Sequence, residues 1–511
     1  MVKRVATEEH IGGALNNELE TPKPFEHLAR HAHLTPSAIA LATEHRDFTY
    51  QQLLRQVKGI AGVLRDAGVQ AGDIVVSQVK TDLHLAMMQA LFHEAVIGCG
   101  YPSQVDVDNP VGFDWFVSHQ YSPTFPAEKT IIIDDSFMLD VTTSPREIDH
   151  RTYDDFSSLC RLRFSSGTTG SPIAIPFTVG HLEGHTRTVD EQWMSLRPVM
   201  SLMTIQNGLG FTCAYSNMRN GDKYIAPGSA AKNLSQIKRN YVAAVIGSPT
   251  QLSELVNEAK KTGARLDDLV RLISAGSYLP LQLVDRIMTI SGATILNSYG
   301  STETGMVAWQ DTLSRDATDV GEILGNVEVQ IVDEDDRLVP PGETGFIRWR
   351  CEFMAQSYFR DAKDHVGGLR NGWFYSGDLG SVSVDNHLHL AGRMSEMINA
   401  GGVKIDPSKV DAAIQASGLV HDVCTFAYQR NEGLVGFGVA IVPSPGFDLG
   451  TLKTLIAQEC RNVKPHAIVE VNSIARNQAG KVLRAEMAKN CAVIWIKRQL
   501  MRLRDPNVRR L

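Results

Sequence analysis

The chain has 511 residues, of which 43% are hydrophobic and 21% are charged, close to the composition of an average soluble globular protein. Fifty basic and 57 acidic residues give a formal net charge of -7, and no basic stretch before the C-terminal tail is dense enough for a nucleic-acid-binding surface. We therefore expect no nucleic acid as a partner. Because one hydrophobic core stops growing at about 250 to 300 residues, we expect at least two domains.

Cysteine usage and hydropathy bear on location. The seven cysteines are scattered and show neither the spacing of a metal site nor that of a disulfide framework, which predicts a cytoplasmic protein. Residues 1–13 lack the apolar run of a secretory signal, and no segment reaches the roughly 18 consecutive apolar residues of a spanning helix. We expect no membrane association.

Between residues 48 and 102 the hydrophobic pattern alternates between that of strands and that of helices. A strand precedes a helix that Gly68 stops, and the apolar residues of this helix recur at helical spacing: Leu53, Val57, Ile60, Ala61 and Leu64. A buried strand from Ile74 to Ser77 and a second helix around Leu83 to Glu94 follow. The same alternation recurs from Tyr241 to Leu296, and it is typical of an α/β domain with a largely parallel sheet.

After Val320 the pattern changes to short strands. Val327 to Val332 and Gly345 to Arg350 are separated by a turn at Pro340-Pro341-Gly342, which predicts antiparallel β structure.

A third pattern begins near Arg393 and continues to about Arg484 as a compact α+β unit. Its predicted elements are a helix from Pro407 to Ser417, strands from Val423 to Tyr428 and from Gly436 to Val442, and a helix from Thr451 to Cys460. We place a domain boundary between Gly392 and Ser395. The predicted fold is α/β, with a large N-terminal domain (1–393) of α/β subdomains plus a short β subdomain, followed by a small, mobile α+β C-terminal domain (394–511).

The tail from Ala488 to Leu511 mixes apolar residues with lysines and arginines. We interpret it as a solvated terminal helix whose apolar face docks on its own protein. A membrane-surface or partner-binding role is the alternative.

A loop of hydroxyls and glycines follows the strand end at Leu162 to Phe164. Glycine lets backbone N–H groups converge on one point and hydroxyls add donors without bulk, so the loop can wrap a polyphosphate. It is not a Walker loop, because no Lys-Ser/Thr follows its last glycine, and a polar linker is the alternative. The loop comprises Ser165, Ser166, Gly167, Thr168, Thr169, Gly170, Ser171 and Pro172.

A second polar cluster, residues 297–305, follows the apolar strand Ala293 to Leu296. The aromatic face of Tyr299 beside an amide can hold a purine, and a hydroxyl next to the carboxylate of Glu303 suits a phosphate and its magnesium ion. A turn with a capping carboxylate is the alternative. The candidate residues are Asn297, Ser298, Tyr299, Gly300, Thr302 and Glu303.

Two further segments each present one charged group. Asp378 sits between glycines in the run from Gly372 to Gly380, where a carboxylate can accept hydrogen bonds from two ribose hydroxyls, although Gly-Asp is more often a simple β-turn. Lys481 follows Gly480 on a loop near the end of the small domain, where it could reach a cleft, although most surface lysines are only solvated.

Taken in order, these segments resemble the adenylate-forming, AMP-binding superfamily, which includes acyl-CoA and aryl-CoA synthetases, peptide-synthetase adenylation domains and beetle luciferases. The resemblance runs from about Phe25 to Arg484 and rests on eight motifs in register. These motifs are Phe48-Thr49-Tyr50, the hydroxyl loop, Ala275-Gly276-Ser277, Tyr299 to Glu303, Trp373 to Asp378, Gly392-Arg393, Gly401-Gly402-Val403-Lys404-Ile405, and Gly480-Lys481.

The resemblance implies ATP, Mg²⁺ and coenzyme A as cofactors and a small carboxylic acid as substrate. Thr302 would bind the α-phosphate, Glu303 would bind magnesium, and Lys481 would bridge the carboxylate and the α-phosphate. The remaining nucleotide-binding residues that it implies are Ser165, Ser166, Gly167, Thr168, Thr169 and Gly170, Gly276 and Ser277, Asn297, Ser298, Tyr299 and Gly300, with Asp378 and Arg393 at the ribose.

The resemblance also implies an acyl pocket and a thiol channel. In this family the small domain swings about a hinge and brings the loop at Gly401 and Gly402 to the thiol channel. The implied acyl-pocket residues are Gln206, Asn207, Gly208, Phe211, Ala275 and Gly300.

The chain departs from the family pattern at three places. Ile173 replaces a lysine that normally supports the outgoing pyrophosphate, and Ser395 replaces the usual aspartate or lysine of the hinge. Gln206-Asn207 replace an aromatic-histidine pair. The segment 208–216 has no charge and lacks the Phe-Asp pair that anchors an α-amino acid, so we expect a neutral or mainly apolar acid.

Three functions remain open. The leading hypothesis is an acid–CoA ligase, monomeric or homodimeric, supported by the intact set of Thr302, Glu303, Asp378 and Lys481. The second is transfer of the acyl group to the phosphopantetheine thiol of a carrier protein, which ends in the same thiol. The third, motivated by Ile173 and Ser395, is a non-catalytic nucleotide-binding homologue.

Overall fold

The computed structural model describes residues 23–100, 112–121, 125–134, 147–164, 173–193, 196–310, 316, 318–359, 368–400, 403–429, 435–460, 463–476 and 482–492. The chain divides into two compact units. The first unit comprises Met1–Arg163, Ala174–Trp193 and Gly208–Ala226, and the second comprises Phe164–Ile173, Met194–Asn207 and Pro227–Leu511. The boundary expected near residue 393 lies inside the second unit and stays a prediction.

The first unit is built on a six-stranded sheet with the order β6-β5-β3-β4-β7-β8. The strands from β6 to β7 are parallel, as the alternating pattern predicts. A three-stranded sheet, β10-β1-β2, lies in the same unit. The elements are α1 (Glu26–Leu34), β1 (Ile39–Ala42), β2 (Asp47–Thr49), α2 (Tyr50–Asp66), β3 (Ile74–Gln78), η2 (Thr81–Leu83), α3 (His84–His93), β4 (Ile97–Gly100), β5 (Trp115–Ser118), η3 (Ala127–Lys129), β6 (Thr130–Ile132), β7 (Leu159–Phe164), β8 (Ala174–Thr178), α5 (Val179–Gln192), α6 (Gly208–Asn220) and β10 (Tyr224–Ile225).

Helix α2 shows how local sequence sets an element in this unit. The Thr49 hydroxyl accepts a hydrogen bond from the Gln52 N–H, and the Gln52 side chain accepts one from the Thr49 N–H, so both orphan donors at the helix start are satisfied. The helix ends before Gly68, whose φ of +97° favours glycine. All five apolar residues that predict this helix are buried.

The second unit contains an eleven-stranded sheet that changes direction part of the way across. Strands β9, β11, β12 and β13 are parallel, whereas every pairing from β13 onward is antiparallel. Its strands are β9 (Val199–Ser201), β11 (Ala244–Gly247), β12 (Arg271–Ala275), β13 (Thr294–Ser301), β14 (Gly305–Gln310), β15 (Asp319–Ile323), β16 (Val327–Val332), β17 (Gly345–Cys351), β18 (Gly368–Arg370), β19 (Trp373–Val382) and β20 (His387–Arg393).

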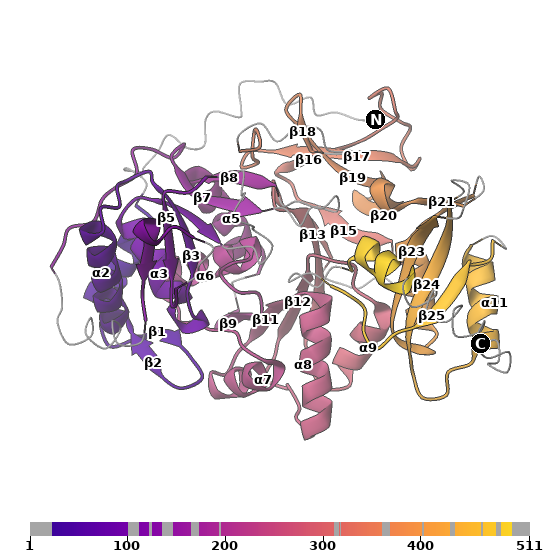
Figure 1. Cartoon of the computed structure of the whole chain (residues 1–511), viewed down its shortest axis with the longest axis horizontal. Coiled ribbons are helices and arrows are strands. Elements are labelled where there is room, and N and C mark those ends of the chain that lie inside the picture. The colour runs from indigo at the N-terminus through magenta and orange to yellow at the C-terminus, as the bar shows by residue number, and fades with distance from the viewer. Residues whose placement is uncertain are drawn as a thin grey trace. The chain divides into compact units, whose positions relative to one another are not determined.

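The antiparallel strands expected after Val320 therefore continue the parallel strands in one sheet. Helices α7 (Ala230–Arg239), α8 (Pro249–Thr262) and α9 (Leu281–Met288) lie side by side, and α8 contacts β11 and β12 of the parallel part (Figure 1). Continuity of the sheet allows residues far apart in sequence, on β13 and β19, to meet.

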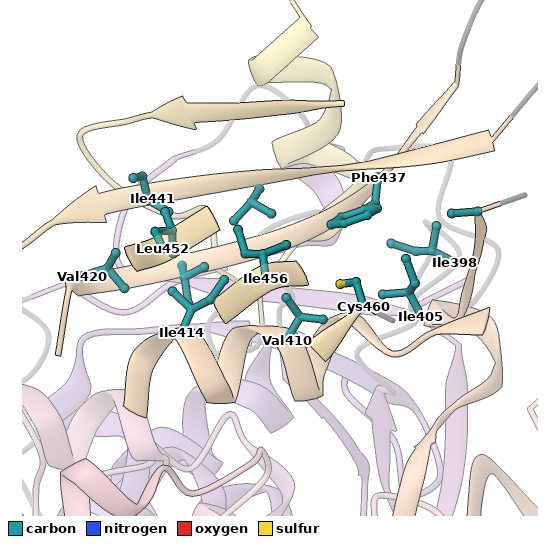
Figure 2. Packing of buried hydrophobic residues seen from close by; sticks show 13 residues of the cluster. Ile398, Ile405, Val410, Ile414, Val420, Phe437, Ile441, Leu452, Ile456 and Cys460 are labelled. Carbon is teal, nitrogen blue, oxygen red and sulfur yellow. The ribbon is translucent and has the colours of Figure 1, made fainter. Parts of the chain in front are cut away.

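The last part of the second unit is the α+β arrangement that the sequence predicts. Helices α10 (Pro407–Ala416) and α11 (Leu449–Glu459) pack against a sheet with the order β23-β24-β25 (Figure 2). In Figure 2, Ile414 of α10 and Leu452 of α11 lie in one cluster with Phe437 of the sheet. The remaining elements are η4 (Met394–Glu396), β21 (Ile398–Ala400), β22 (Val403–Ile405), β23 (Val420–Gln429), β24 (Val435–Pro443) and β25 (Ala467–Glu470).

Residues 484–492 are helical, and the rest of the C-terminal tail lies outside the described residues. Within the described part of the chain, none of the helices has the length and apolar character needed to cross a bilayer. All seven cysteines are free thiols, and six of them are buried.

The burial of the cluster in Figure 2 predicts how a substitution within it changes the free energy of unfolding. Val439 of β24 is fully buried in this cluster, so Val439→Ala removes buried methyl groups and leaves a cavity, which we expect to cost about 2 kcal/mol. Val384→Ala is the matched control, because Val384 is fully exposed. Chemical denaturation should show a lower midpoint for the Val439 variant alone. Equal effects of the two substitutions would contradict this assignment of the core.

Candidate functional site

Several predicted site residues lie at one edge of the large sheet. In parallel strands the carboxyl ends share an edge, and this edge is where α/β proteins bind ligands. Strand β12 ends there at Ala275, which pairs with Ser298 of β13, and Gly276 and Ser277 follow directly. Gln206 and Asn207 come five and six residues after the end of β9, a parallel strand that β11 separates from β12. The structure thus brings the amide, hydroxyl and glycine residues of three separate motifs to a common edge.

Strands β13 and β14 form a hairpin at this edge, and it is unusually tight. A Cβ atom on Gly300 would lie only 2.1 Å from the carbonyl oxygen of Gly305. No side chain fits in that space, so glycine is required at residue 300. The close approach holds the hairpin loop, residues 302–304, next to the residues of β13 that are predicted to bind the nucleotide.

Glu303 occupies this hairpin loop and is buried, with 8% of its surface exposed. Burial raises the pKa of Glu303 above its ordinary value, although hydrogen bonds, including one from Ser301, and the positive charge of Arg393 oppose this shift. The backbone carbonyl of Glu303 accepts a hydrogen bond from the Ala355 N–H at 2.8 Å. The loop therefore presents a carboxylate whose ionised form is destabilised by burial. A bound cation would stabilise that ionised form.

Thr304 fastens the same loop to the antiparallel part of the sheet. Its hydroxyl lies 3.0 Å from the Ser301 hydroxyl and accepts a hydrogen bond from the indole N–H of Trp349 at 2.9 Å. Trp349 on β17 is fully buried. Thr302, the predicted phosphate ligand, is only half-buried, so its neighbours are anchored while its own side chain stays accessible.

Tyr299, Asp378 and Arg393 converge across three strands of the same sheet. The Tyr299 hydroxyl on β13 donates a hydrogen bond to Oδ2 of Asp378 on β19 at 2.6 Å. Asp378 is opposite Arg393 of β20, and Oδ1 of the carboxylate lies 3.5 Å from Nε of the guanidinium. The structure therefore joins two of the predicted motifs through a direct side-chain contact.

Ser376 holds this cluster in place and was not among the sequence candidates. Its hydroxyl accepts a hydrogen bond from the Asp378 N–H at 3.0 Å, and its carbonyl accepts one from Nη2 of Arg393 at 3.3 Å. The sequence Ser-Gly-Asp is typical of a turn in which the serine hydroxyl accepts a hydrogen bond from the aspartate N–H. That Ser376 also contacts Arg393 follows only from the pairing of β19 with β20.

Tyr299 is a neutral hydrogen-bond donor in this arrangement. Burial, and then the Asp378 carboxylate, raise the pKa of the Tyr299 hydroxyl well above its usual value. The ring of Tyr299 packs edge-on against Trp349, with centroids 5.7 Å apart. One aromatic side chain thus connects the predicted purine position with the predicted ribose position.

Some predicted residues lie elsewhere. Gly208 and Phe211 belong to α6 in the first unit, whereas the other predicted acyl-pocket residues belong to the second. The whole hydroxyl loop, with Ser165, Ser166, Gly167, Thr168, Thr169 and Gly170, lies outside the described residues, as do Gly401, Gly402 and Lys481.

The residues that flank the Lys481 segment are nonetheless well anchored. Arg476 and Val482 form an isolated antiparallel bridge, and Nη2 of Arg476 lies 2.7 Å from Oδ1 of Asp422. On the other side, Nη1 of Arg484 donates to the Thr425 carbonyl at 2.8 Å. These contacts fasten both ends of the segment 477–481 to strand β23.

Arg484 also reaches the segment that follows Arg393. Its Nε donates to Glu396 at 3.1 Å, its Nη2 donates to Ser408 at 3.0 Å, and its Nη1 donates to Asp411. Glu396 belongs to η4, which begins directly after Arg393. The predicted hinge region and the predicted lysine loop are thus connected by one buried guanidinium.

The described residues contain no group of three or more histidine, cysteine, aspartate or glutamate side chains arranged to hold a metal ion. Glu303 could still share a cation with the oxygens of a bound phosphate, because Mg²⁺ commonly takes one or two carboxylates together with substrate phosphates.

Comparisons with known proteins find one family and several relatives. Residues 119–359 match the family described as AMP-binding enzyme. The chain is 26% identical over 499 residues to a feruloyl-CoA synthase from Amycolatopsis, covering 90% of this chain and 97% of that protein. It is 25% identical over 515 residues to a fatty acid–[acyl-carrier-protein] ligase from Mycobacterium marinum, covering 91% and 97%.

A solved structure shows the same fold. The O-succinylbenzoate coenzyme A synthetase from Bacillus subtilis, in complex with AMP, matches with a TM-score of 0.77 at 20% identity, covering 91% of this chain and 98% of that one. This likeness confirms the predicted α/β architecture with its smaller C-terminal α+β part.

The raised pKa of Glu303 predicts how the stability of the folded protein depends on pH. Because the folded-state pKa is higher than the ordinary value of 4.5, ionisation of Glu303 opposes folding above that pH, and the cost vanishes below it. Without added metal, Glu303→Gln should raise the melting temperature near neutral pH by roughly 2 °C or more and leave it unchanged below pH 4.5.

The control for this measurement is Glu343→Gln, which removes an exposed carboxylate. A stabilisation by Glu303→Gln that persists below pH 4.5, or that the control reproduces, would show that ionisation of the buried carboxylate is not its cause.

Proposed function

We infer that this chain, an AMP-binding protein of the acyl-CoA and aryl-CoA synthetase type, uses ATP to convert a small carboxylic acid into an acyl-adenylate and then transfers the acyl group to coenzyme A. The observation that carries this inference is the cluster of Tyr299, Asp378 and Arg393 beside the buried Glu303, because it combines groups suited to adenine, ribose and metal-bound phosphate at one sheet edge.

We assign the nucleoside to this cluster. Asp378 accepts hydrogen bonds from the two ribose hydroxyls, and Arg393 lies beside that carboxylate and orients it. The ring of Tyr299 stacks on adenine, while Asn297 and the Gly276-Ser277 backbone meet its edge. When a ribose binds, its hydroxyl replaces the Tyr299 hydroxyl as a donor to Asp378, so the existing 2.6 Å contact marks where a donor is accepted.

We assign the phosphates to the hairpin loop and the hydroxyl loop. Thr302 donates to the α-phosphate, and residues 165–170 surround the β- and γ-phosphates. The single buried carboxylate of Glu303 fits a magnesium ion that is also bound by phosphate oxygens, and such an ion supplies charge neutralisation when bound.

Two half-reactions follow from this arrangement. In the first, a carboxylate oxygen of the acid attacks the α-phosphorus, an O–P bond forms, and pyrophosphate leaves. Lys481 offsets the negative charge that builds up between the carboxylate and the α-phosphate. In the second, the coenzyme A thiol loses its proton, its sulfur attacks the acyl carbon, and AMP leaves.

The second half-reaction needs a different arrangement of residues, so we propose that residues 394–511 act as a mobile domain relative to 1–393. The turn would take place near Ser395, and the loop with Gly401 and Gly402 would then line the thiol channel. The contacts of Arg484 with Glu396 and with β23 support movement of the small domain as one body, because they connect its first segment to the flanks of the Lys481 loop.

The uncharged segment 208–216 suits an acid whose body is neutral or mainly apolar, and it provides no carboxylate for the ammonium of an α-amino acid. Ile173 is half-buried next to β8 and supplies no charge to pyrophosphate, so we expect a slower first half-reaction than a lysine would give.

Transfer to a carrier protein is the second candidate, since one relative is a fatty acid–[acyl-carrier-protein] ligase. The deciding experiment supplies ATP, Mg²⁺ and a panel of carboxylic acids, and it measures pyrophosphate release and the thioester formed with coenzyme A or with a phosphopantetheinylated carrier. We expect the coenzyme A thioester. Thioester on the carrier alone would favour the second candidate, and ATP binding with no pyrophosphate from any acid would favour a non-catalytic protein.

The role of Lys481 gives a further prediction. Lys481→Ala should slow adenylation on the order of 100-fold and affect thioester formation from a supplied acyl-adenylate far less, because the charge acts only in the first half-reaction. Lys489→Ala is the matched control, since Lys489 is an exposed lysine on the following helix. Equal losses in both half-reactions would contradict the assignment.

A further inference from the structure

Strand β7 in the first unit carries two buried arginines. Arg161 and Arg163 are two residues apart, so both side chains lie on the same face of the strand, and each is about 6% exposed. The guanidinium carbon of Arg161 lies 4.0 Å from the ring centroid of Phe211, and that of Arg163 lies 3.3 Å from the centroid of Phe177. Arginine does not lose its proton in proteins, so two positive charges are enclosed here.

The described contacts of Arg163 are with a hydroxyl, an imidazole and aromatic rings, and none of them is with a carboxylate. Its Nη2 donates to the Thr212 hydroxyl at 2.9 Å, and its Nη1 lies 3.4 Å from Nδ1 of His185. Its Nε is buried without a hydrogen-bond partner among the described residues. Burial, and then the neighbouring Arg161, lower the pKa of Arg163 well below its usual value. Burial therefore destabilises the charged form of this side chain.

The same guanidinium lies against the start of helix α6. A Cβ atom on Gly208, the first residue of the helix, would lie 3.5 Å from Cδ and 3.6 Å from Nη1 of Arg163. The N-terminal end of a helix carries a partial positive charge, so a cation placed there is repelled and an anion is favoured. The helix end and the Arg163 guanidinium thus both favour an anion at this place.

The neutral contacts do not balance this charge. A hydrogen bond to a hydroxyl and a contact with an aromatic face each stabilise a cation, but neither supplies the negative charge that would offset the desolvation of a buried guanidinium. An oxyanion between Arg163 and the first turn of α6 would remove the deficit, since guanidinium groups bind carboxylates and phosphates through paired hydrogen bonds.

We propose that Arg163 binds a second anionic group, a distal carboxylate, of the acid that this protein activates. The proposal rests on the proposed function and names its substrate class as an acid with an apolar body and two carboxylates. A carboxylate is favoured over a nucleotide phosphate because Arg163 contacts α6, the helix that contributes Gly208 and Phe211 to the predicted acyl pocket. The neutral segment 208–216 contacts the body of such an acid, and the strand beside it supplies the charge.

The first test uses the unmodified protein. Dicarboxylic acids of graded length are compared with monocarboxylic acids of equal length, in which a methyl group replaces the distal carboxylate, and kcat/KM is measured from pyrophosphate release. We expect at least a tenfold preference for one or more dicarboxylic acids. Equal use of the pairs, or a preference for the monocarboxylic acids, overturns the proposal while leaving acid activation established.

The second test uses Arg163→Met, with Arg163→Lys as the conservative variant. The Met variant should lose on the order of 100-fold in kcat/KM with the preferred dicarboxylic acid and much less with its monocarboxylic partner, and the Lys variant should recover part of the preference. Arg46→Met is the control, because Arg46 is an exposed arginine that also lies over an aromatic ring, 4.3 Å from the centroid of Phe48.

The kinetic constants for the nucleotide separate the two sources of an oxyanion. If Arg163→Met raises the KM for ATP, or weakens inhibition by pyrophosphate, equally with every acid, the guanidinium serves the phosphates and the proposal is wrong. Should Arg163→Met fail to fold, Thr212→Val replaces it, since that change removes only the hydroxyl that orients the guanidinium. Unchanged selectivity in the Thr212 variant together with equal use of the acid pairs by the unmodified protein overturns the proposal.

Discussion

The hydrogen bond from the Tyr299 hydroxyl to the Asp378 carboxylate shows that the predicted adenine and ribose positions lie side by side. It joins residues 79 positions apart, and it forms because β13 and β19 belong to one sheet that is parallel on one side and antiparallel on the other. The turn in direction occurs at the β13–β14 hairpin, whose close approach at Gly300 allows no side chain. Any change that separates the two halves of the sheet would therefore part the predicted adenine and ribose positions.

We propose that bound ligands compensate two of the buried charges of this protein. Glu303 is a buried carboxylate with a raised pKa, and Arg163 is a buried guanidinium that contacts no carboxylate among the described residues. Each buried charge lowers the free energy of unfolding of the free protein, and an ion of opposite charge would offset that loss on binding. The same side chain would therefore destabilise the free protein and strengthen binding of the ligand. Arg484 differs, because its guanidinium already donates to the carboxylates of Glu396 and Asp411 and so connects η4 with α10.

The sequence predicts local structure well here and non-local contacts poorly. The helix at residues 50–66, the strand at 74–78 and the α+β elements after residue 407 follow from periodicity, and Asp378 between glycines is recognisable as a candidate. Periodicity does not reveal that the strands after Val320 continue the parallel sheet, nor that Ser376 serves both Asp378 and Arg393, because both depend on strand pairing. The burial of Arg163 is not predictable from the sequence for a similar reason. It depends on contacts with α5 and α6, which lie far from the strand in sequence.

The most direct measurement of the central claim is a crystal structure with a non-hydrolysable acyl-adenylate analogue. The account predicts that both ribose hydroxyls donate to the Asp378 carboxylate, that the Tyr299 ring stacks on the adenine, and that the Lys481 ammonium lies within hydrogen-bonding distance of the group that replaces the phosphate. A ribose bound away from Asp378, with the Tyr299 hydroxyl still donating to an otherwise empty carboxylate, would contradict it.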